Sequence, residues 1–139
     1  KVVGEINMSM SDSESEGTNK LFDVAPVFVK ALSLPRVLIV DEFGSSMHPM
    51  ITRMLISLFN NKKTNPMGSQ LVFATHDTNL LDNSFLRRDQ IWFTEKNDVA
   101  ATDLYSLVEF KDASGAKVRN DRSFEKDYIN GRYGAIPYL

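Results

Sequence analysis

Residues 37–48 read Val37-Leu38-Ile39-Val40-Asp41-Glu42-Phe43-Gly44-Ser45-Ser46-Met47-His48. Four apolar residues are followed at once by two carboxylates, and a Gly-Ser-Ser turn comes next. A run that is apolar at consecutive positions is typical of a strand buried on both faces in a parallel sheet. Because ligands of open α/β sheets bind beyond the carboxyl ends of such strands, we expect Asp41 and Glu42 to lie at a phosphate site.

Two adjacent carboxylates at the end of a strand suit nucleotide hydrolysis for separate reasons. Asp41 would hold Mg²⁺, because this ion prefers oxygen ligands and retains several waters. Glu42, pointing to the opposite side of the chain, would orient or deprotonate an attacking water. A hydrophobic run that ends in Asp-Glu is the Walker B pattern of P-loop ATPases, although the same residues also fit a buried strand capped by two solvated acids.

The composition is that of an ordinary globular protein. The chain has 139 residues, 42% hydrophobic and 24% charged, which is enough for one domain with a modest core. The net charge of −2 indicates neither nucleic acid nor an acidic membrane as a partner, although a local basic surface would be compatible with it. Cysteine is absent, and no apolar run approaches the roughly 20 residues of a membrane span. We therefore expect a cytoplasmic protein without a membrane partner.

The segment before this strand combines a polar loop with an amphipathic helix. Residues 1–17 are rich in serine, acidic residues and glycine, which predicts a flexible loop. From Thr18 to Leu32 apolar residues recur every three or four positions, which predicts a helix that either begins near Pro26 or kinks there. Gly17 and Thr18 would then lie at or near a helix N-terminus, where backbone N–H groups can bind an anion.

A second strand ends on a histidine. Residues 70–75 are mainly apolar and are followed by His76, while a helix that begins near Pro49 separates this strand from the first. Strand, helix and strand in this order form a βαβ unit, whose strands run parallel. We therefore expect His76 on the same edge of the sheet as Asp41 and Glu42.

The rest of the chain predicts a hairpin and a polar tail. Residues 90–96 and 102–108 have strand-like patterns and are separated by a short turn, which indicates a terminal β-hairpin. The tail, 111–139, is polar, and its segment 124–129 is expected to form one or two helical turns. Its arginines, glycines and tyrosines suit contact with phosphate, but such a tail more often packs on its own domain.

Four motifs follow one another along the chain: Ser15-Glu16-Gly17-Thr18, Val37 to Glu42, Ser45-Ser46-Met47-His48-Pro49 and Ala74-Thr75-His76-Asp77. This order resembles the carboxyl half of ABC-type ATPases, with its signature loop, Walker B strand, D-loop and switch histidine. The sequence is more similar to SMC-like, AAA-type bacterial ATPases of abortive infection and phage resistance. Those proteins share the Ser-x-His-Pro, Thr-His-Asp-Thr and Arg-Arg-Asp-Gln-Ile-Trp-Phe stretches found here at 46–49, 75–78 and 87–93. The resemblance covers residues from about 13 to 139.

The resemblance implies a role in binding ATP and Mg²⁺ for each motif. Asp41 would serve Mg²⁺, Glu42 the attacking water and His76 the γ-phosphate. The signature would complete the ATP site of a second protomer in a homodimer, and the D-loop would cross between protomers. The residues concerned are Ser15, Gly17 and Thr18 of the signature, and Ser45 and Ser46 of the D-loop. The signature here reads Ser-Glu-Gly-Thr instead of Ser-Gly-Gly-Gln, and Gly44 stands where these proteins often carry an acid.

No Gly-x-x-x-x-Gly-Lys-[Ser/Thr] motif occurs in the 139 residues, so the sequence lacks the P-loop that cradles phosphates. In the family this motif lies far upstream, and we expect this chain to be the carboxyl-terminal part of a longer ATPase. The predicted fold is α/β, the carboxyl-terminal half of an ABC-type P-loop NTPase. It would comprise a mainly parallel sheet flanked by helices, a terminal β-hairpin and a C-terminal tail. Residues 1–17 would lead into the signature, and residues 18–139 would form the ATPase half.

The predicted function is ATP binding and hydrolysis in anti-phage defence, with hydrolysis acting on a partner effector protein. Two other function classes stay open. In a non-catalytic interaction module the acids and the histidine would be relics, and the acidic loop and the arginine tail would bind a partner protein. A Toprim-type metal-dependent nuclease also places acids at strand ends. It needs a further Asp-x-Asp pair on the next strand, however, and Thr75-His76-Asp77 does not supply one.

Overall fold

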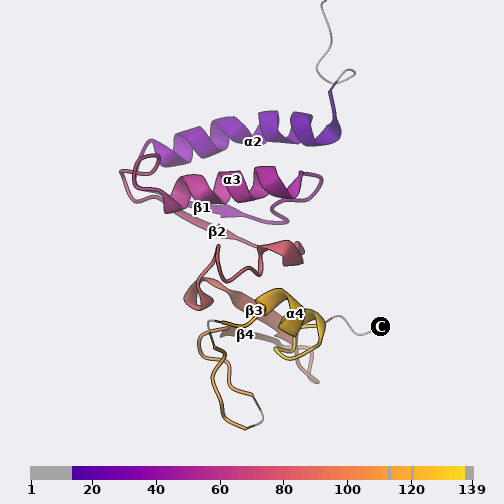
Figure 1. Ribbon diagram of the computed structural model, residues 1–139. Coiled ribbons are helices and arrows are strands. Elements are labelled where there is room, and N and C mark those ends of the chain that lie inside the picture. Colours follow the sequence, from indigo (N-terminus) through magenta and orange to yellow (C-terminus); the bar gives the residue numbers. More distant parts are fainter. Residues whose placement is uncertain (1–13, 113, 120, 137–139) are drawn as a thin grey trace, which may run out of the picture. The chain divides into compact units, whose positions relative to one another are not determined.

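Figure 1 shows the computed structural model, which describes residues 14–112, 114–119 and 121–136. The chain divides into two compact units, Lys1–Asp77 and Thr78–Leu139. Most of the loop predicted over residues 1–17 lies outside the described residues. Glu16 and Gly17, at its end, already belong to a helix, so this helix begins two residues earlier than predicted.

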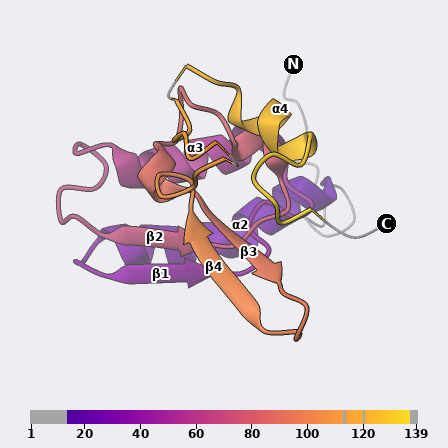
Figure 2. The ribbon, with the colours of Figure 1, turned by 90° about the horizontal axis from the view of Figure 1, so that it is seen from below.

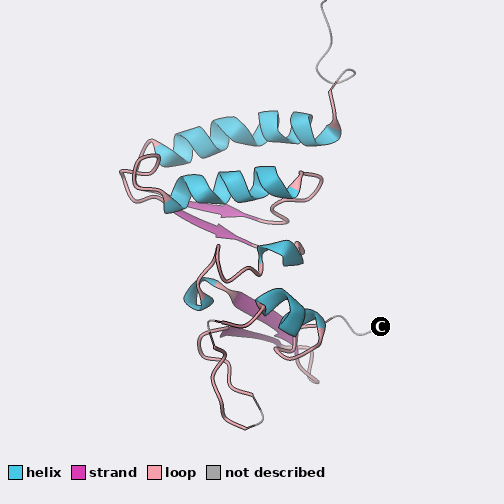
Figure 3. Ribbon diagram, in the orientation of Figure 1, coloured by secondary structure: helices cyan, strands magenta, loops and turns pink. Residues whose placement is uncertain are grey.

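The first unit is a pair of parallel strands with two helices on one face. Helix α2 (Glu16–Leu32) precedes β1 (Val37–Val40), and helix α3 (Pro49–Asn60) precedes β2 (Gln70–Phe73). The two strands pair in parallel along their whole length. Figures 1 and 3 show both helices on the same side of the strands. The βαβ unit predicted from the sequence is therefore confirmed.

Capping side chains fix where the helices of this unit begin. Ser15 is the N-cap of α2, and its Oγ accepts a backbone N–H of the first turn at 3.2 Å. His48 caps α3 through Nδ1, which accepts the N–H of Met50 at 3.2 Å, and Pro49 occupies the first helical position. These caps satisfy N–H donors that have no partner inside the helix. Helix α2 continues through Pro26, so it does not begin at this proline.

No helix in the described part of the chain is long and apolar enough to cross a membrane.

Aromatic rings join the helices of the first unit to its strands. The ring of Phe28 on α2 stacks on that of Phe43, with centroids 5.7 Å apart and planes inclined by 18°. Phe59 on α3 meets Phe28 edge-on at 5.7 Å, and Phe73 on β2 lies 5.2 Å from Phe43. Phe43 is only 2% exposed. The residue directly after the two carboxylates is therefore the centre of this core.

The other face of the strand pair is open to solvent. Ile39 is 75% exposed, and Val37 and Val72, on the same face, are 56% and 53% exposed. The prediction that β1 is buried on both faces is wrong in the described chain, because the helices of this unit cover one face only. The described strands also form two separate two-stranded sheets. The parallel pairing is thus confirmed, whereas one mainly parallel sheet is not what these residues form.

The second unit contains a β-hairpin and a short helix. Strands β3 (Trp92–Lys96) and β4 (Thr102–Ser106) pair antiparallel, and Figure 2 shows them running in opposite directions. Two 3₁₀ turns, η1 (Thr78–Leu80) and η2 (Arg88–Gln90), precede the hairpin, and helix α4 (Phe124–Ile129) follows it. The predicted terminal hairpin and the helical turns in the tail are confirmed.

Aromatic residues also form the core of the second unit. The ring of Phe93 stacks on Tyr128, with centroids 5.4 Å apart and planes inclined by 10°, and lies 5.8 Å from the ring of Tyr133. The hydroxyl of Tyr105 donates a hydrogen bond to the backbone carbonyl of Tyr133. Burial and the neighbouring Glu95 carboxylate raise the pKa of Tyr105 to about 12, so this phenol remains a donor at neutral pH.

A buried carboxylate organises the tail. Asp127 is 7% exposed, accepts two hydrogen bonds from the guanidinium of Arg122, and accepts a third from the Tyr133 hydroxyl at 3.1 Å. Nη1 of Arg132 lies 3.8 Å from the same carboxylate. The hydrogen bonds from Arg122 hold the pKa of Asp127 below its usual range. These tail residues therefore pack on their own unit, the behaviour that the sequence pattern favoured.

Asp127→Asn is expected to destabilise the second unit at neutral pH and much less in acid. Because folding lowers this pKa, the ionised carboxylate adds stability above the unfolded-state pKa of about 3.9, and this stability is lost as pH falls through the folded-state pKa. We expect a loss of about 2 kcal/mol at pH 7, measured in urea by the fluorescence of Trp92, the only tryptophan. The control Asp121→Asn removes only the exposed partner of Arg119 and should change little. Equal losses at pH 7 and pH 3 would contradict the ionic role.

Candidate functional site

A bulge interrupts the strand ladder at the two carboxylates. The N–H of Ala74 donates to the carbonyl of Val40 at 3.0 Å, and the N–H of Phe43 donates to the carbonyl of Ala74 at 2.8 Å. Bonds of a parallel ladder recur at every second residue, so residue 42 would be the next donor in an unbroken ladder. One extra residue is therefore inserted in the first strand. Glu42 accommodates it by adopting the left-handed region, with φ of 50°.

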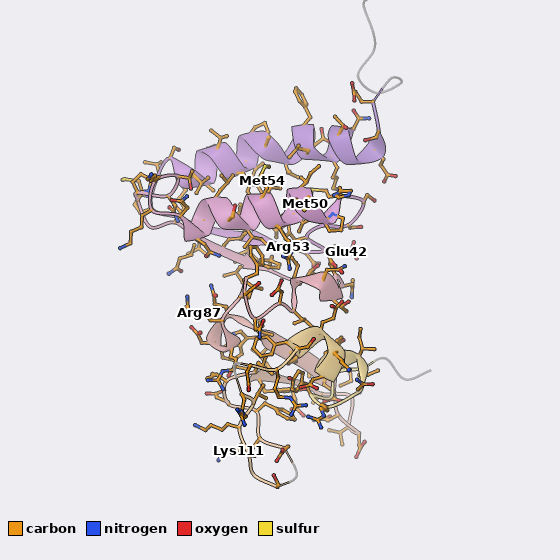
Figure 4. All side chains as sticks on the ribbon, in the orientation of Figure 1. Glu42, Met50, Arg53, Met54, Arg87 and Lys111 are labelled. Atoms are coloured by element: carbon orange, nitrogen blue, oxygen red, sulfur yellow. The ribbon has the colours of Figure 1, made fainter. Side chains whose placement is uncertain are left out.

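The bulge determines where the carboxylates lie. Asp41 and Glu42 are both exposed, while Phe43 returns to the core. Oδ1 of Asp41 accepts the N–H of Glu42 at 3.0 Å. Figure 4 shows Glu42 beyond the carboxyl end of β1. Because the regular strand ends at Val40, the bulge sets the directions of the two acids, and the strand alternation assumed from the sequence does not apply.

The turn that follows the two carboxylates, residues 44–47 and called the serine turn below, depends on Gly44. The N–H of Ser45 donates to the carbonyl of Glu42, and that of Met47 donates to the carbonyl of Gly44, both at 3.1 Å. Gly44 has φ of 89°, and a Cβ at this position would lie 3.1 Å from two atoms of the Thr52 side chain. An acidic residue at position 44, common in the proteins that the sequence resembles, would therefore be strained and crowded here. This contact gives the departure from the motif a physical reason.

The N-terminus of α2 packs against the serine turn. A Cβ on Gly17 would lie 3.2 Å from the backbone carbonyl oxygen of Ser46, so the two segments approach closely. The Ser15 hydroxyl bonds to the backbone N–H of Thr18 at 3.2 Å and to the Thr18 hydroxyl at 2.9 Å. The fold thus brings Gly17, a residue of the predicted signature, next to Ser46, which lies about 30 residues further along the sequence. Ser45, in the same turn, is exposed.

His76 emerges from the neighbouring strand at the same end of the sheet. It is exposed and lies three residues after Phe73, the last residue of β2, which pairs with the last residue of β1. The hydroxyl of Thr75 donates to the carbonyl of Phe43 at 2.8 Å. His76 and the acidic bulge, which consists of Asp41 and Glu42, therefore leave the parallel strand pair at one edge, as the sequence predicts.

Sequence reasoning missed two threonines that hold this site. Thr75 bonds to the bulge, and its place beside the histidine at a strand end was the available signal. Thr52 packs against Gly44, is fully buried, and its Oγ1 has no hydrogen-bond partner within the described chain. Nothing in the sequence distinguishes Thr52 from any other helical residue. The histidine of the Ser-x-His-Pro motif has a structural role, since His48 caps α3.

The residues around the bulge suit Mg²⁺ held together with phosphate. No group of three or more His, Cys, Asp or Glu side chains placed to bind a metal occurs among the described residues. Mg²⁺ usually takes one or two carboxylates from the protein and completes its shell with water and substrate phosphates. An exposed carboxylate at a strand end, Asp41, fits that pattern. The assignment of Mg²⁺ to Asp41 stays a prediction.

Gly17→Ala is expected to displace the serine turn. Alanine favours a helix over glycine by about 0.5–1 kcal/mol, but its Cβ would press on the Ser46 carbonyl. We expect changed backbone amide shifts for residues 45–47 in a ¹H–¹⁵N spectrum, without the gain in stability that the helix propensity alone would give. Lys20→Ala, at an exposed position of the same helix, serves as the control. A turn unaffected by Gly17→Ala would contradict the close packing.

Gly44→Ala is expected to lower the free energy of unfolding by about 1–3 kcal/mol. The variant adds both a left-handed alanine and a contact with Thr52. Gly68→Ala provides the matched control, because Gly68 also has a positive φ, 71°, but has no atom within 4 Å of the added Cβ. Urea unfolding of Gly68→Ala measures the cost of the left-handed alanine. The additional loss in Gly44→Ala measures the cost of the contact with Thr52. Equal losses would show that the contact with Thr52 contributes nothing.

Comparison with known proteins identifies the family of this chain. A family model described as "AAA domain, putative AbiEii toxin, Type IV TA system" matches residues 7–82, just over half of the chain. This span includes the N-terminus of α2, the acidic bulge, the serine turn and His76. No curated protein and no solved structure matches the chain. The chain therefore belongs to this AAA domain family, whose members have the P-loop NTPase fold of nucleotide-binding, ATPase-like domains.

Proposed function

We propose that this chain supplies the Walker B, signature and switch-histidine part of an ABC-type, SMC-like ATPase that binds and hydrolyses ATP with Mg²⁺. The observation that carries the proposal is the bulge after β1. It lifts Asp41 and Glu42 out of the ladder at the edge where His76 leaves β2. The family match supports a nucleotide as the ligand in this proposal.

Each residue at the edge has a distinct chemical task in this proposal. Asp41 holds Mg²⁺, which supplies the charge that neutralises the phosphates. Glu42 orients the attacking water and accepts its proton, a role that its exposed position allows. His76 contacts the γ-phosphate as a hydrogen-bond donor.

The nucleotide is held between two copies of the chain. Ser15, Gly17 and Thr18 at the N-terminus of α2 bind the phosphate of the ATP held by the other protomer, where backbone N–H groups favour an anion. Ser45 and Ser46 lie between the protomers. The close packing of α2 on the serine turn supports this arrangement, because it places Gly17 next to Ser46 in one protomer.

The phosphate cradle comes from outside these 139 residues. The sequence lacks the P-loop motif, and without its lysine and backbone cradle the ATP site is incomplete. The open apolar face of β1 and β2 supports the proposal, since a parallel sheet is usually covered on both faces. The 139-residue chain alone then binds ATP weakly and does not hydrolyse it.

The biological role follows the family description and the sequence resemblance. The family name refers to a toxin of a type IV toxin–antitoxin system, and the motifs resemble ATPases of abortive infection. In this role ATP joins two protomers, and hydrolysis releases or activates a partner effector protein.

Glu42→Gln in the protein that carries this chain together with its P-loop is expected to slow ATP turnover at least a hundredfold, about the lower limit of what a general base contributes. Glutamine keeps the size of the side chain but cannot accept the proton, so ATP-bound dimers should also last longer. Steady-state phosphate release and size-exclusion chromatography with ATP measure the two effects. Asp98→Asn, at an exposed turn of the hairpin, is the matched control for the same chemical change.

Turnover that is absent in the wild type, or unchanged in Glu42→Gln, would favour the non-catalytic interaction module. DNA cleavage that needs Mg²⁺ or Mn²⁺ but not ATP would favour the Toprim-type nuclease. Both readings fail if turnover depends on Glu42.

A further inference from the structure

The hydroxyl of Thr75 joins the two halves of the candidate site. It donates a hydrogen bond to the carbonyl of Phe43 at 2.8 Å and accepts one from the N–H of Asp77 at 3.1 Å. Phe43 directly follows Glu42, and Asp77 directly follows His76. One half-buried side chain therefore connects the residue after the acid to the residue after the histidine.

The bulge explains why a side chain is needed at this point. The ladder between the two strands ends at Ala74, whose carbonyl accepts the N–H of Phe43. Beyond this bond no backbone hydrogen bond joins the two segments among the described residues, and the carbonyl of Phe43 is paired with the Thr75 hydroxyl. A backbone carbonyl in a partly buried setting requires such a partner.

The anchor on one side of this link is rigid. The ring of Phe43 is 2% exposed, stacks on Phe28 and lies 5.2 Å from the tilted ring of Phe73 in the core of the first unit. The backbone on the other side, around exposed His76, lies outside any helix or strand. A hydrogen bond from Thr75 to Phe43 thus holds an irregular segment against a fixed point.

We propose that Thr75 is a positioning residue, whose hydroxyl sets the position of His76 relative to Glu42. This inference rests on the proposed function for its effect on ATP turnover, but the link itself is independent of catalysis. A misplacement of about 1 Å is enough to reduce turnover by as much as a hundredfold.

Two substitutions separate the hydroxyl from the rest of the side chain. Thr75→Val keeps the branched shape and removes both hydrogen bonds, whereas Thr75→Ser keeps the hydroxyl. Thr94→Val removes a hydroxyl from an exposed position of the hairpin and serves as the control. Amide hydrogen exchange in the 139-residue chain reports on the link, and kcat and KM for ATP are measured in the protein that also carries the P-loop.

In Thr75→Val we expect the Asp77 amide to exchange at least tenfold faster and kcat to fall between about tenfold and a hundredfold, with KM for ATP within about twofold of wild type. Thr75→Ser and Thr94→Val should behave like the wild type in both measurements. Unchanged exchange in Thr75→Val would overturn the link. Faster exchange with unchanged kcat in an enzyme that turns over ATP would overturn the positioning role. A wild type without turnover would refute the proposed function, and the exchange measurement alone would then decide on the link.

Discussion

The first unit depends on the burial of Phe43. Its N–H is bound to the carbonyl of Ala74 on β2, and its ring stacks on Phe28 and contacts Phe73. Both attachments require this residue to rejoin the sheet one position later than a regular ladder allows. The two residues before it must therefore loop out. Asp41 and Glu42 are exposed to solvent because the burial of Phe43 pushes them out of the ladder.

The free energy gained by burying Phe43 can be compared with the cost of the strain at Glu42. A left-handed conformation costs a residue other than glycine about 1–2 kcal/mol, and Glu42 adopts one. Burying a phenylalanine side chain contributes about 1.5–3 kcal/mol, and its stacking partners add to this. The burial of Phe43 is thus sufficient to offset the strain at Glu42. A strained residue beside a well-packed one is a common arrangement at functional sites, because the packing holds the strain in place.

The sequence predicts most of the helices and strands of this chain but not the bulge at Asp41 and Glu42. Hydrophobic periodicity and Pro49 are local signals, and they correctly indicate α3, the parallel strand pair and the hairpin. The bulge leaves no such signal, since glutamate has no special preference for a positive φ and the residue that demands the bulge is Phe43. The exposure of Ile39 could not be predicted either. The apolar pattern of its strand favours burial on both faces, but it does not show which segments cover each face. Thr75 and Thr52 act through contacts across more than one element, which local patterns do not encode.

The charges of the tail limit where an anion can bind. Its arginines already have carboxylate partners, Asp121 for Arg119 and Asp127 for Arg122 and Arg132. A phosphate at these side chains would have to displace an existing partner, and at Asp127 it would leave a buried carboxylate unpaired. The N-terminus of α2 carries no such penalty, because the cap on its Thr18 N–H is the neutral hydroxyl of Ser15, and the other N–H groups of the first turn have no acceptor within the helix. Electrostatics therefore disfavours the arginines of the tail as an anion site, whereas a phosphate beside Asp41 and Glu42 requires a cation such as Mg²⁺ to offset the two carboxylates.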